Sequence, residues 1–242
     1  MENRNFQLDA EWNIIHSPEK PTGFGILLIG DERHFVDESK SFWLQNEGRL
    51  AMINQLKEAG YTIFSSNLYG RNWGSDEAAE LAVRLYHYVL RSEIMNNKIH
   101  ILAEGMGALV AVKLFEKLKG SIRSTVLLNP ILSLKHQLEQ EKEHKFFYKK
   151  LTKEIEAAYK QDYRHLEKEI FSSQLNVGDE IPIKLIQVMT GGRSYNQAKL
   201  NQQLLKKQID NHVVQTSFIL PEKKLRLGSI IVKFYKSHEK VL

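Results

Sequence analysis

The residues best placed to do chemistry lie in the short turn Ala103-Glu104-Gly105-Met106-Gly107-Ala108. An apolar strand pattern, Lys98-Ile99-His100-Ile101-Leu102, precedes this turn, and a helical pattern from Ala108 to Lys119 follows it. A sharp strand-to-helix turn needs small residues around its apex, and it aims backbone N–H groups and the positive end of the helix at whatever lies above. The turn therefore predicts a binding point for a carbonyl or carboxylate oxygen, with Gly105 at its apex.

A second group of chemically capable residues, Asp31, Glu32 and His34, follows the continuous apolar run from Phe24 to Gly30. A carboxylate and an imidazole within hydrogen-bond reach can act together as general acid and base. The pairs Asp31/His34 and Glu104/His34 could do this if the loop brought their side chains together. The alternative is that these charged loop residues are solvated.

No metal or cofactor is expected. The nine histidines show no His-x-x-x-His or similar ligand spacing on one helix, and the absence of cysteine excludes disulfides and thiolate metal sites. The sequence has no phosphate-binding G-x-x-x-x-G-K-[ST] motif. The run Gly105-Met106-Gly107-Ala108 matches only the start of a dinucleotide fingerprint, because the third glycine is missing and Asn129, not an acid, ends the following strand.

Strand patterns alternate with helical patterns along most of the chain, which predicts a parallel sheet built from right-handed βαβ units and an α/β fold class. In such a sheet, ligands bind at the carboxyl ends of the strands. The expected strands are 6–14, 24–29, 61–64, 98–102, 125–128, 183–188 and 213–219, and the expected helices are 48–59, 78–90, 108–119, 196–209 and 230–235.

The alternation is interrupted by a highly charged helical insertion at residues 134–172. Apolar residues recur along it at helical spacing and form one stripe: Leu151, Ile155, Tyr159, Tyr163, Leu166 and Ile170. This pattern predicts a helical cap over the domain, with the stripe used for packing. The alternative for the stripe is a groove that binds a partner.

These segments together resemble the α/β-hydrolase superfamily. The turn, with Ala103 and Gly107 as flanking small residues, is similar to the nucleophile elbow G-x-S-x-G. The run Asn67–Asp76 resembles the family's D-x-x-G-x-G-x-S loop, Ile29-Gly30-Asp31 its oxyanion segment, and Ile181-Pro182-Ile183 the opening of the strand before the catalytic acid. The resemblance implies a single α/β-hydrolase domain over residues 1–242, with 134–172 as its cap.

The departures from the family pattern bear on activity. Gly105 falls at the nucleophile position and has no side chain to acylate, and the segment 189–193, where the acid is expected, holds no carboxylate. Asn129 occupies the alternative acid position, and 220–229, where the histidine is expected, contains none. Because loss of a nucleophile from a comparable triad costs about 10⁶ in kcat, a catalytically inactive protein is predicted.

Three functions stay open. The first is an inactive protein that binds a small apolar or carboxylate- or ester-like ligand, or a protein partner, in a pocket at Gly30, Asp31, Glu104, Gly105 and Met106. The second is an active esterase or thioesterase with an atypical nucleophile or base. The third is an interaction protein that uses the cap stripe or the basic segment 199–242, which has nine Lys or Arg against three acids.

Composition adds a few bounds. The chain is 42% hydrophobic and 26% charged, which is ordinary for one globular domain. No apolar stretch approaches the roughly 18 residues of a membrane span, and no nucleic-acid motif accompanies the basic segment. The start Met1-Glu2-Asn3-Arg4 leads into polar residues without an apolar signal core, so a cytoplasmic protein is expected.

Overall fold

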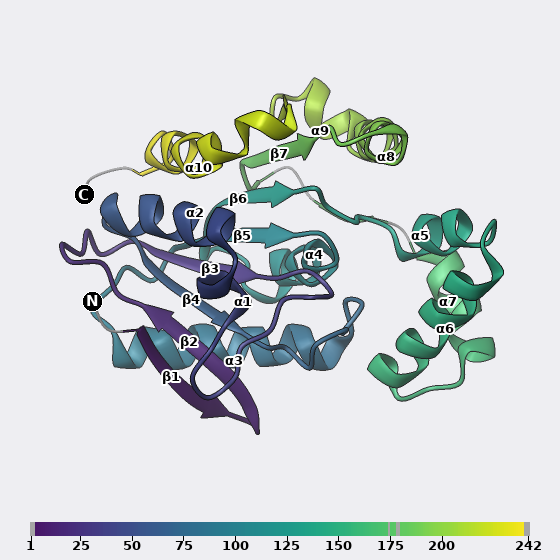
Figure 1. Ribbon diagram of the computed structural model, residues 1–242, viewed down its shortest axis with the longest axis horizontal. Helices are drawn as coiled ribbons and strands as arrows, with labels where there is room; N and C mark the ends of the chain where they lie inside the picture. The colour runs from purple at the N-terminus through teal and green to yellow at the C-terminus, as the bar shows by residue number, and fades with distance from the viewer. Residues whose placement is uncertain (1–2, 174, 178–179, 240–242) are drawn as a thin grey trace.

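The computed structural model describes residues 3–173, 175–177 and 180–239. Within these residues an eight-stranded sheet forms the centre of the molecule, in the order β1-β2-β4-β3-β5-β6-β7-β8 (Figure 1). All neighbouring strands from β4 onward pair in parallel, whereas β1–β2 and β2–β4 pair antiparallel. The strands are β1 (Asn3–Leu8), β2 (Glu11–His16), β3 (Gly25–Ile29), β4 (Thr62–Ser66), β5 (Ile99–Glu104), β6 (Ile122–Leu128), β7 (Ile183–Val188) and β8 (Val214–Ile219).

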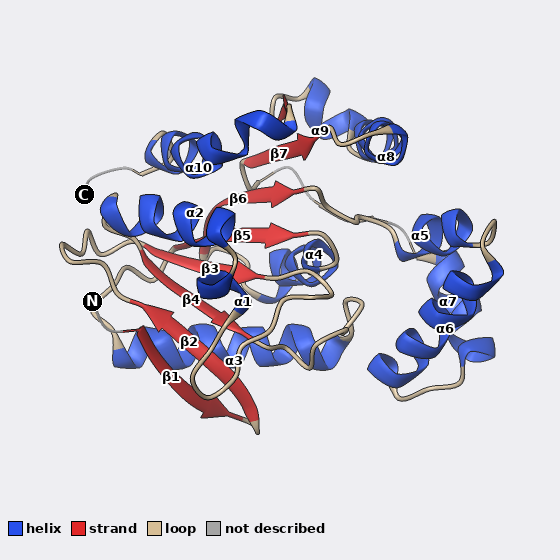
Figure 2. Ribbon diagram, in the orientation of Figure 1, coloured by secondary structure: helices blue, strands red, loops and turns tan. Residues whose placement is uncertain are grey.

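Helices cover both faces of the sheet (Figure 2). The helices α2 (Glu47–Glu58) and α10 (Leu227–Lys236) pack together over one face, and α3 (Asp76–Ser92) and α4 (Gly107–Lys117) cover the other. Residues of the central strand β3 are buried on both faces, as its continuous apolar sequence predicts. Four further helical elements connect these parts: α1 (Phe42–Gln45), α8 (Gly192–Leu204), α9 (Lys206–Asp210) and the 3₁₀ helix η1 (Pro221–Arg226). The predicted α/β class is confirmed.

Two predicted elements are wrong in their extent. The single strand expected over residues 6–14 is a hairpin, because Asp9 and Ala10 take left-handed φ angles of 51° and 63° and reverse the chain. The alternation of apolar and polar residues continues through this turn, so the sequence gives no sign of the reversal. The helix expected over 196–209 starts earlier, at Gly192, and is divided at Leu205 into α8 and α9.

The segment between β6 and β7 forms α5 (Leu134–Glu141), α6 (Lys145–Tyr159) and α7 (Tyr163–Ser172), which lie beyond the carboxyl ends of the strands (Figure 1). The apolar stripe is packed, as predicted: its members Leu151, Ile155, Leu166 and Ile170 are buried in one cluster with Trp73 and Met106. None of the described helices is long and apolar enough to cross a membrane.

Candidate functional site

In the turn after β5, the backbone passes close to neighbouring backbone, as its small residues predict. Gly105 takes a φ of +53°, a left-handed conformation that glycine adopts at little cost. Its N–H donates to the Leu128 carbonyl at 3.0 Å, and its own carbonyl accepts from the Ile131 N–H at 2.9 Å. A β-carbon on Gly107 would lie 2.6 Å from the Gly30 carbonyl oxygen. Only glycine at 107 therefore lets α4 start this close to the end of β3.

The space beside Gly105 is filled by the carboxyl group of Asp31. A β-carbon on Gly105 would overlap Cγ and both carboxylate oxygens of Asp31. The Met106 N–H, at the start of α4, donates to Asp31 Oδ1 at 2.8 Å. Burial raises the pKa of Asp31 above its ordinary value, and the hydrogen bond from Met106 partly offsets this rise. The predicted oxygen-binding point thus holds an oxygen of the chain itself.

Glu104 is buried next to this carboxyl group, at 6% exposure. Its Oε1 accepts from Arg49 of α2, and its Oε2 lies 3.9 Å from His34 Nε2. Burial raises the pKa of Glu104 to about 7; Asp31 adds to this rise, and Arg49 opposes it. Glu104 Oε2 receives no hydrogen bond in the structure. The structure thus brings Glu104 and His34 near each other, beyond hydrogen-bond distance, and the alternative of a solvated Glu104 is wrong.

His34 is fixed from several sides. Its Nδ1 accepts from the Asp31 main-chain N–H at 3.0 Å, so the contact with Asp31 runs through the backbone and not through the carboxylate. Its ring stacks on Phe42 with centroids 4.0 Å apart and meets the edge of Trp43 at 4.5 Å. Burial, with the nearby charge of Arg49, lowers the pKa of His34 to about 3. The imidazole is therefore neutral at physiological pH.

A cavity of about 690 Å³ lies between this site and the α5–α7 segment. Asp31 lines it, whereas Gly30 lines a much smaller cavity together with Asp31 and His34. Met106 is buried in the cluster beneath α6, at 1% exposure. Charged side chains of both signs line the large cavity: Asp31, Glu32, Glu141, Glu154, Arg33, Arg49, Lys150, Arg193 and Lys224.

The loop after β4 ties the sheet to α6 beside this cavity. Trp73 Nε1–H donates to Glu154 Oε2 at 3.0 Å, and the Tyr159 hydroxyl donates to the Trp73 and Gly74 carbonyls at 3.2 Å. Arg71 pairs with the same carboxylate, Glu154, at 3.0 Å. These bonds hold the cavity wall formed by α6 in place. Sequence reasoning identified the loop but not Glu154, because a single acid on a charged helix carries no signal.

Asn129, at the alternative acid position, also lines the large cavity. Its side-chain oxygen accepts from the Val188 N–H at 2.7 Å and from Gln187 Nε2 at 3.2 Å. With a left-handed φ of 45°, it links the ends of β6 and β7. Both hydrogen bonds use the amide oxygen of Asn129 as acceptor, so this side chain stabilises the contact between the ends of β6 and β7.

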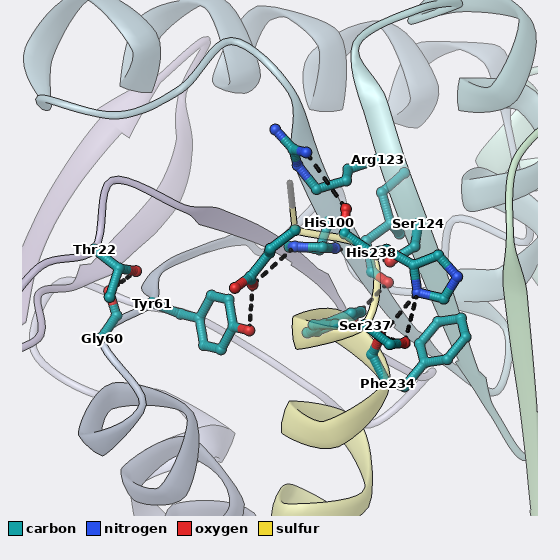
Figure 3. A network of polar contacts seen from close by, with 12 residues as sticks. Thr22, Gly60, Tyr61, His100, Arg123, Ser124, Phe234, Ser237 and His238 are labelled. Atoms are coloured by element: carbon teal, nitrogen blue, oxygen red, sulfur yellow. Dashed lines mark hydrogen bonds and ion pairs between the residues drawn. The ribbon is translucent and has the colours of Figure 1, made fainter. Parts of the chain in front are cut away.

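A serine–histidine–carboxylate geometry does occur (Figure 3), but near the amino ends of the central strands β5 and β6. His100 Nδ1 lies 2.8 Å from Ser124 Oγ, and His100 Nε2 lies 3.4 Å from Glu239 Oε1. The Tyr61 hydroxyl donates to the same Glu239 oxygen, and the Tyr235 ring stacks on His100 at 4.2 Å. Ser124 and His100 are both 0% exposed, so a substrate has no path to this hydroxyl. Sequence reasoning placed His100 in a strand and assigned no site role to Ser124 or Glu239.

Within the described part of the chain, no group of three or more His, Asp and Glu side chains is arranged to hold a metal ion. The carboxyl groups of Asp31 and Glu104 instead use a backbone N–H and a guanidinium as partners. Near pH 7 the Glu104 carboxyl group, with a pKa of about 7, is partly protonated, and a neutral imidazole lies close to it. Asp31, Glu104 and His34 themselves supply no hydroxyl or thiol nucleophile.

No family model matches the chain, and no curated protein matches it. Solved structures do resemble it over nearly its whole length. A thermostable carboxyl esterase from Bacillus coagulans is 14% identical, with 98% of each chain covered and a TM-score of 0.61. The fluorophosphonate-binding serine hydrolase F of Staphylococcus aureus is 12% identical, with 98% of this chain and 97% of that chain covered and a TM-score of 0.63.

A puromycin-hydrolyzing peptidase of Mycobacterium tuberculosis has a TM-score of 0.70 at 12% identity, and this chain covers 39% of its length. The sheet order, the helices on both faces and these neighbours together define the α/β-hydrolase fold, as the sequence predicted. At such low sequence identity, the structural similarity establishes the fold but does not assign the activities of these proteins to this chain.

Proposed function

We propose that this chain is a catalytically inactive α/β-hydrolase-fold protein that binds a small ligand in the 690 Å³ cavity, with residues 134–172 as its cap. The observation that carries the proposal is the position of the Asp31 carboxyl group. It fills the space where a nucleophilic side chain on Gly105 would stand, and it takes the Met106 N–H that an oxyanion would need.

The missing base supports the same conclusion. His34 is the histidine next to this turn, and its Nδ1 already accepts the Asp31 N–H while its Nε2 faces Glu104. A ring held between Phe42 and Trp43 does not turn freely toward Gly105. Serine hydrolysis needs an imidazole that takes a proton from the nucleophile. The arrangement around Gly105 therefore lacks both partners of that step.

The cavity indicates the kind of ligand. Its walls combine apolar side chains with basic ones: Phe42, Ile131, Leu151, Val188 and Leu227 with Arg33, Lys150, Arg193 and Lys224. Its volume lies within the usual range of small-molecule pockets, about 300–1,000 Å³. A compound with an apolar body and a carboxylate or ester group suits this lining, because the guanidinium groups can pair with its oxygens.

The proposal is tested by intact-mass measurement after exposure to a fluorophosphonate probe, with an active serine hydrolase in the same tube as the positive control. We expect no adduct on the wild-type chain and none on Gly105→Ser. Contaminating esterases cannot produce a mass shift on this chain. A stoichiometric adduct mapped to one residue of the wild type would overturn the inactive assignment and identify the nucleophile.

One observation favours a second candidate, an esterase or thioesterase that works without an acyl-enzyme. A carboxyl group with a pKa of about 7, such as Glu104, has the proton affinity of an effective general base. This candidate requires ester turnover without an adduct, lost in Glu104→Gln by about 10² or more. Turnover that the substitution leaves unchanged rejects Glu104 as the base.

A further inference from the structure

The outward side of the first half of α6 carries two exposed aromatic rings. Phe146 is 75% exposed and Phe147 is 52% exposed, and their ring centroids lie 5.6 Å apart. Leu151 and Ile155 of the same helix are buried inside the α5–α7 segment, on the face opposite Phe146, and Phe147 lies at the border of that packed face, one turn before Leu151. The helix is therefore anchored by one face and presents phenyl rings on another.

Lysines surround these rings. Between residues 142 and 153 the chain has five lysines, Lys142, Lys145, Lys149, Lys150 and Lys153, against the single acid Glu143. All five are exposed. On a helix, residues three, four and seven positions after Phe146 lie on its face, and these positions are Lys149, Lys150 and Lys153. This face of α6 is thus both basic and aromatic.

The same surface adjoins the ligand cavity. Phe147 and Lys150 are among the residues that line the cavity, while Phe146, Lys149 and Lys153 lie on the neighbouring outer face. Anything that covers the outer face also lies across the edge of the cavity.

We propose that the surface formed by residues 142–153, which comprise the turn before α6 and its first half, docks on an anionic phospholipid bilayer. Lysines near a membrane surface are attracted by acidic headgroups, and phenylalanine side chains enter the boundary between headgroups and acyl chains. Charge complementarity argues for an acidic surface. The two adjacent phenyl rings, which have no polar atom to hydrate, argue for a bilayer as that surface. Docking would place the edge of the cavity against the membrane. This proposal does not depend on whether the cavity site is catalytic.

The test is co-sedimentation of the full chain with vesicles of phosphatidylcholine alone or of phosphatidylcholine mixed with phosphatidylserine. Wild-type protein should pellet with the mixed vesicles only. Lys149→Glu with Lys153→Glu should lower the partition coefficient by at least about 30-fold, since each interfacial lysine contributes roughly fivefold and each new carboxylate is repelled by the acidic headgroups. Phe146→Ser with Phe147→Ser should lower it by about tenfold. Because all four side chains are exposed, these variants should fold.

The matched control reverses two exposed charges in another basic segment, Lys223→Glu with Arg226→Glu in η1, which also presents the exposed Leu225. Binding that survives this control but fails in the α6 variants supports the proposal. Three results overturn it: no wild-type binding to acidic vesicles, loss of binding in the η1 variant alone, or binding that the phenylalanine pair does not affect. Tight binding to an RNA homopolymer, with none to acidic vesicles, would assign the lysines to a nucleic acid instead.

Discussion

The contact between Gly105 and Asp31 predicts a measurable coupling between their substitutions. In Gly105→Ala, a non-glycine residue at φ +53° costs about 1–2 kcal/mol from the backbone alone. The new β-carbon also displaces the Asp31 carboxyl group from the Met106 N–H, and a hydrogen bond to a charged group contributes roughly 1.5–3 kcal/mol. We therefore expect Gly105→Ala to lower the free energy of unfolding by about 2.5–5 kcal/mol.

In an Asp31→Ala background the displaced group is absent, so the same Gly105→Ala change should cost only about 1–2 kcal/mol. The two substitutions should then couple by roughly 1.5–3 kcal/mol. The assay is urea unfolding of the four proteins at neutral pH, followed by tryptophan fluorescence and extrapolated linearly to water. A chain of this length should lose roughly 2–4 °C of Tm per kcal/mol.

Gly120 supplies the matched control. It takes a left-handed φ of +82°, and a β-carbon there would meet nothing within 4 Å. Gly120→Ala should therefore show the backbone cost of about 1–2 kcal/mol and no coupling to Asp31→Ala. Additivity of the Gly105 and Asp31 effects within about 0.5 kcal/mol would refute the reasoning, because it would mean that the carboxyl group does not fill this space.

Three further predictions concern stability. Burial raises the pKa of Glu104 from 4.5 to about 7 on folding, so the stability that this protonated group contributes is complete below pH 4.5 and is lost as the pH rises through 7. Relative to Glu104→Gln, the wild-type free energy of unfolding, measured by urea titration, should fall by about 2–3 kcal/mol between pH 5 and pH 8. Glu239→Ala removes the acceptor of the Tyr61 hydroxyl and should cost about 1–3 kcal/mol in thermal melts, whereas the exposed Glu222→Ala should cost under about 0.5 kcal/mol. Ile155→Ala, at a fully buried position of α6, should cost about 2–5 kcal/mol by chemical denaturation; a loss under 1 kcal/mol would mean that the stripe is not packed in solution.

The sheet could be predicted from sequence because its signals are local. A buried parallel strand such as Gly25–Ile29 appears as an unbroken apolar run, and the small residues of the turn after β5 report a close approach that the Gly30 carbonyl confirms. The hairpin at Asp9 and Ala10 could not be predicted in the same way. Its reversal uses left-handed residues without glycine, inside an alternation that continues on both sides.

The candidate site was predictable in position but not in content. The sequence indicated Gly105 as the apex, and it placed Asp31, Glu104 and His34 at neighbouring strand ends. That the Asp31 carboxyl group reaches the Met106 N–H depends on the path of a loop 75 residues away in sequence. The pairing of Glu104 with Arg49 similarly joins a strand to a helix 55 residues apart, through side-chain positions that no spacing rule encodes.

The arrangement around Gly105 also explains why a single substitution is a poor route to hydrolysis. A serine at 105 must first displace the Asp31 carboxyl group, which is held by the Met106 N–H in a partly buried position. Removal of that carboxyl group would free the N–H for a substrate oxygen but would supply no base, because the His34 ring is fixed by the backbone of residue 31 and by its aromatic neighbours. The space at Gly105 is filled by the Asp31 carboxyl group, and position 129 holds an amide that joins the ends of β6 and β7. The proposed inactive assignment therefore predicts that Gly105→Ser, alone or combined with Asp31→Ala, will not hydrolyse esters.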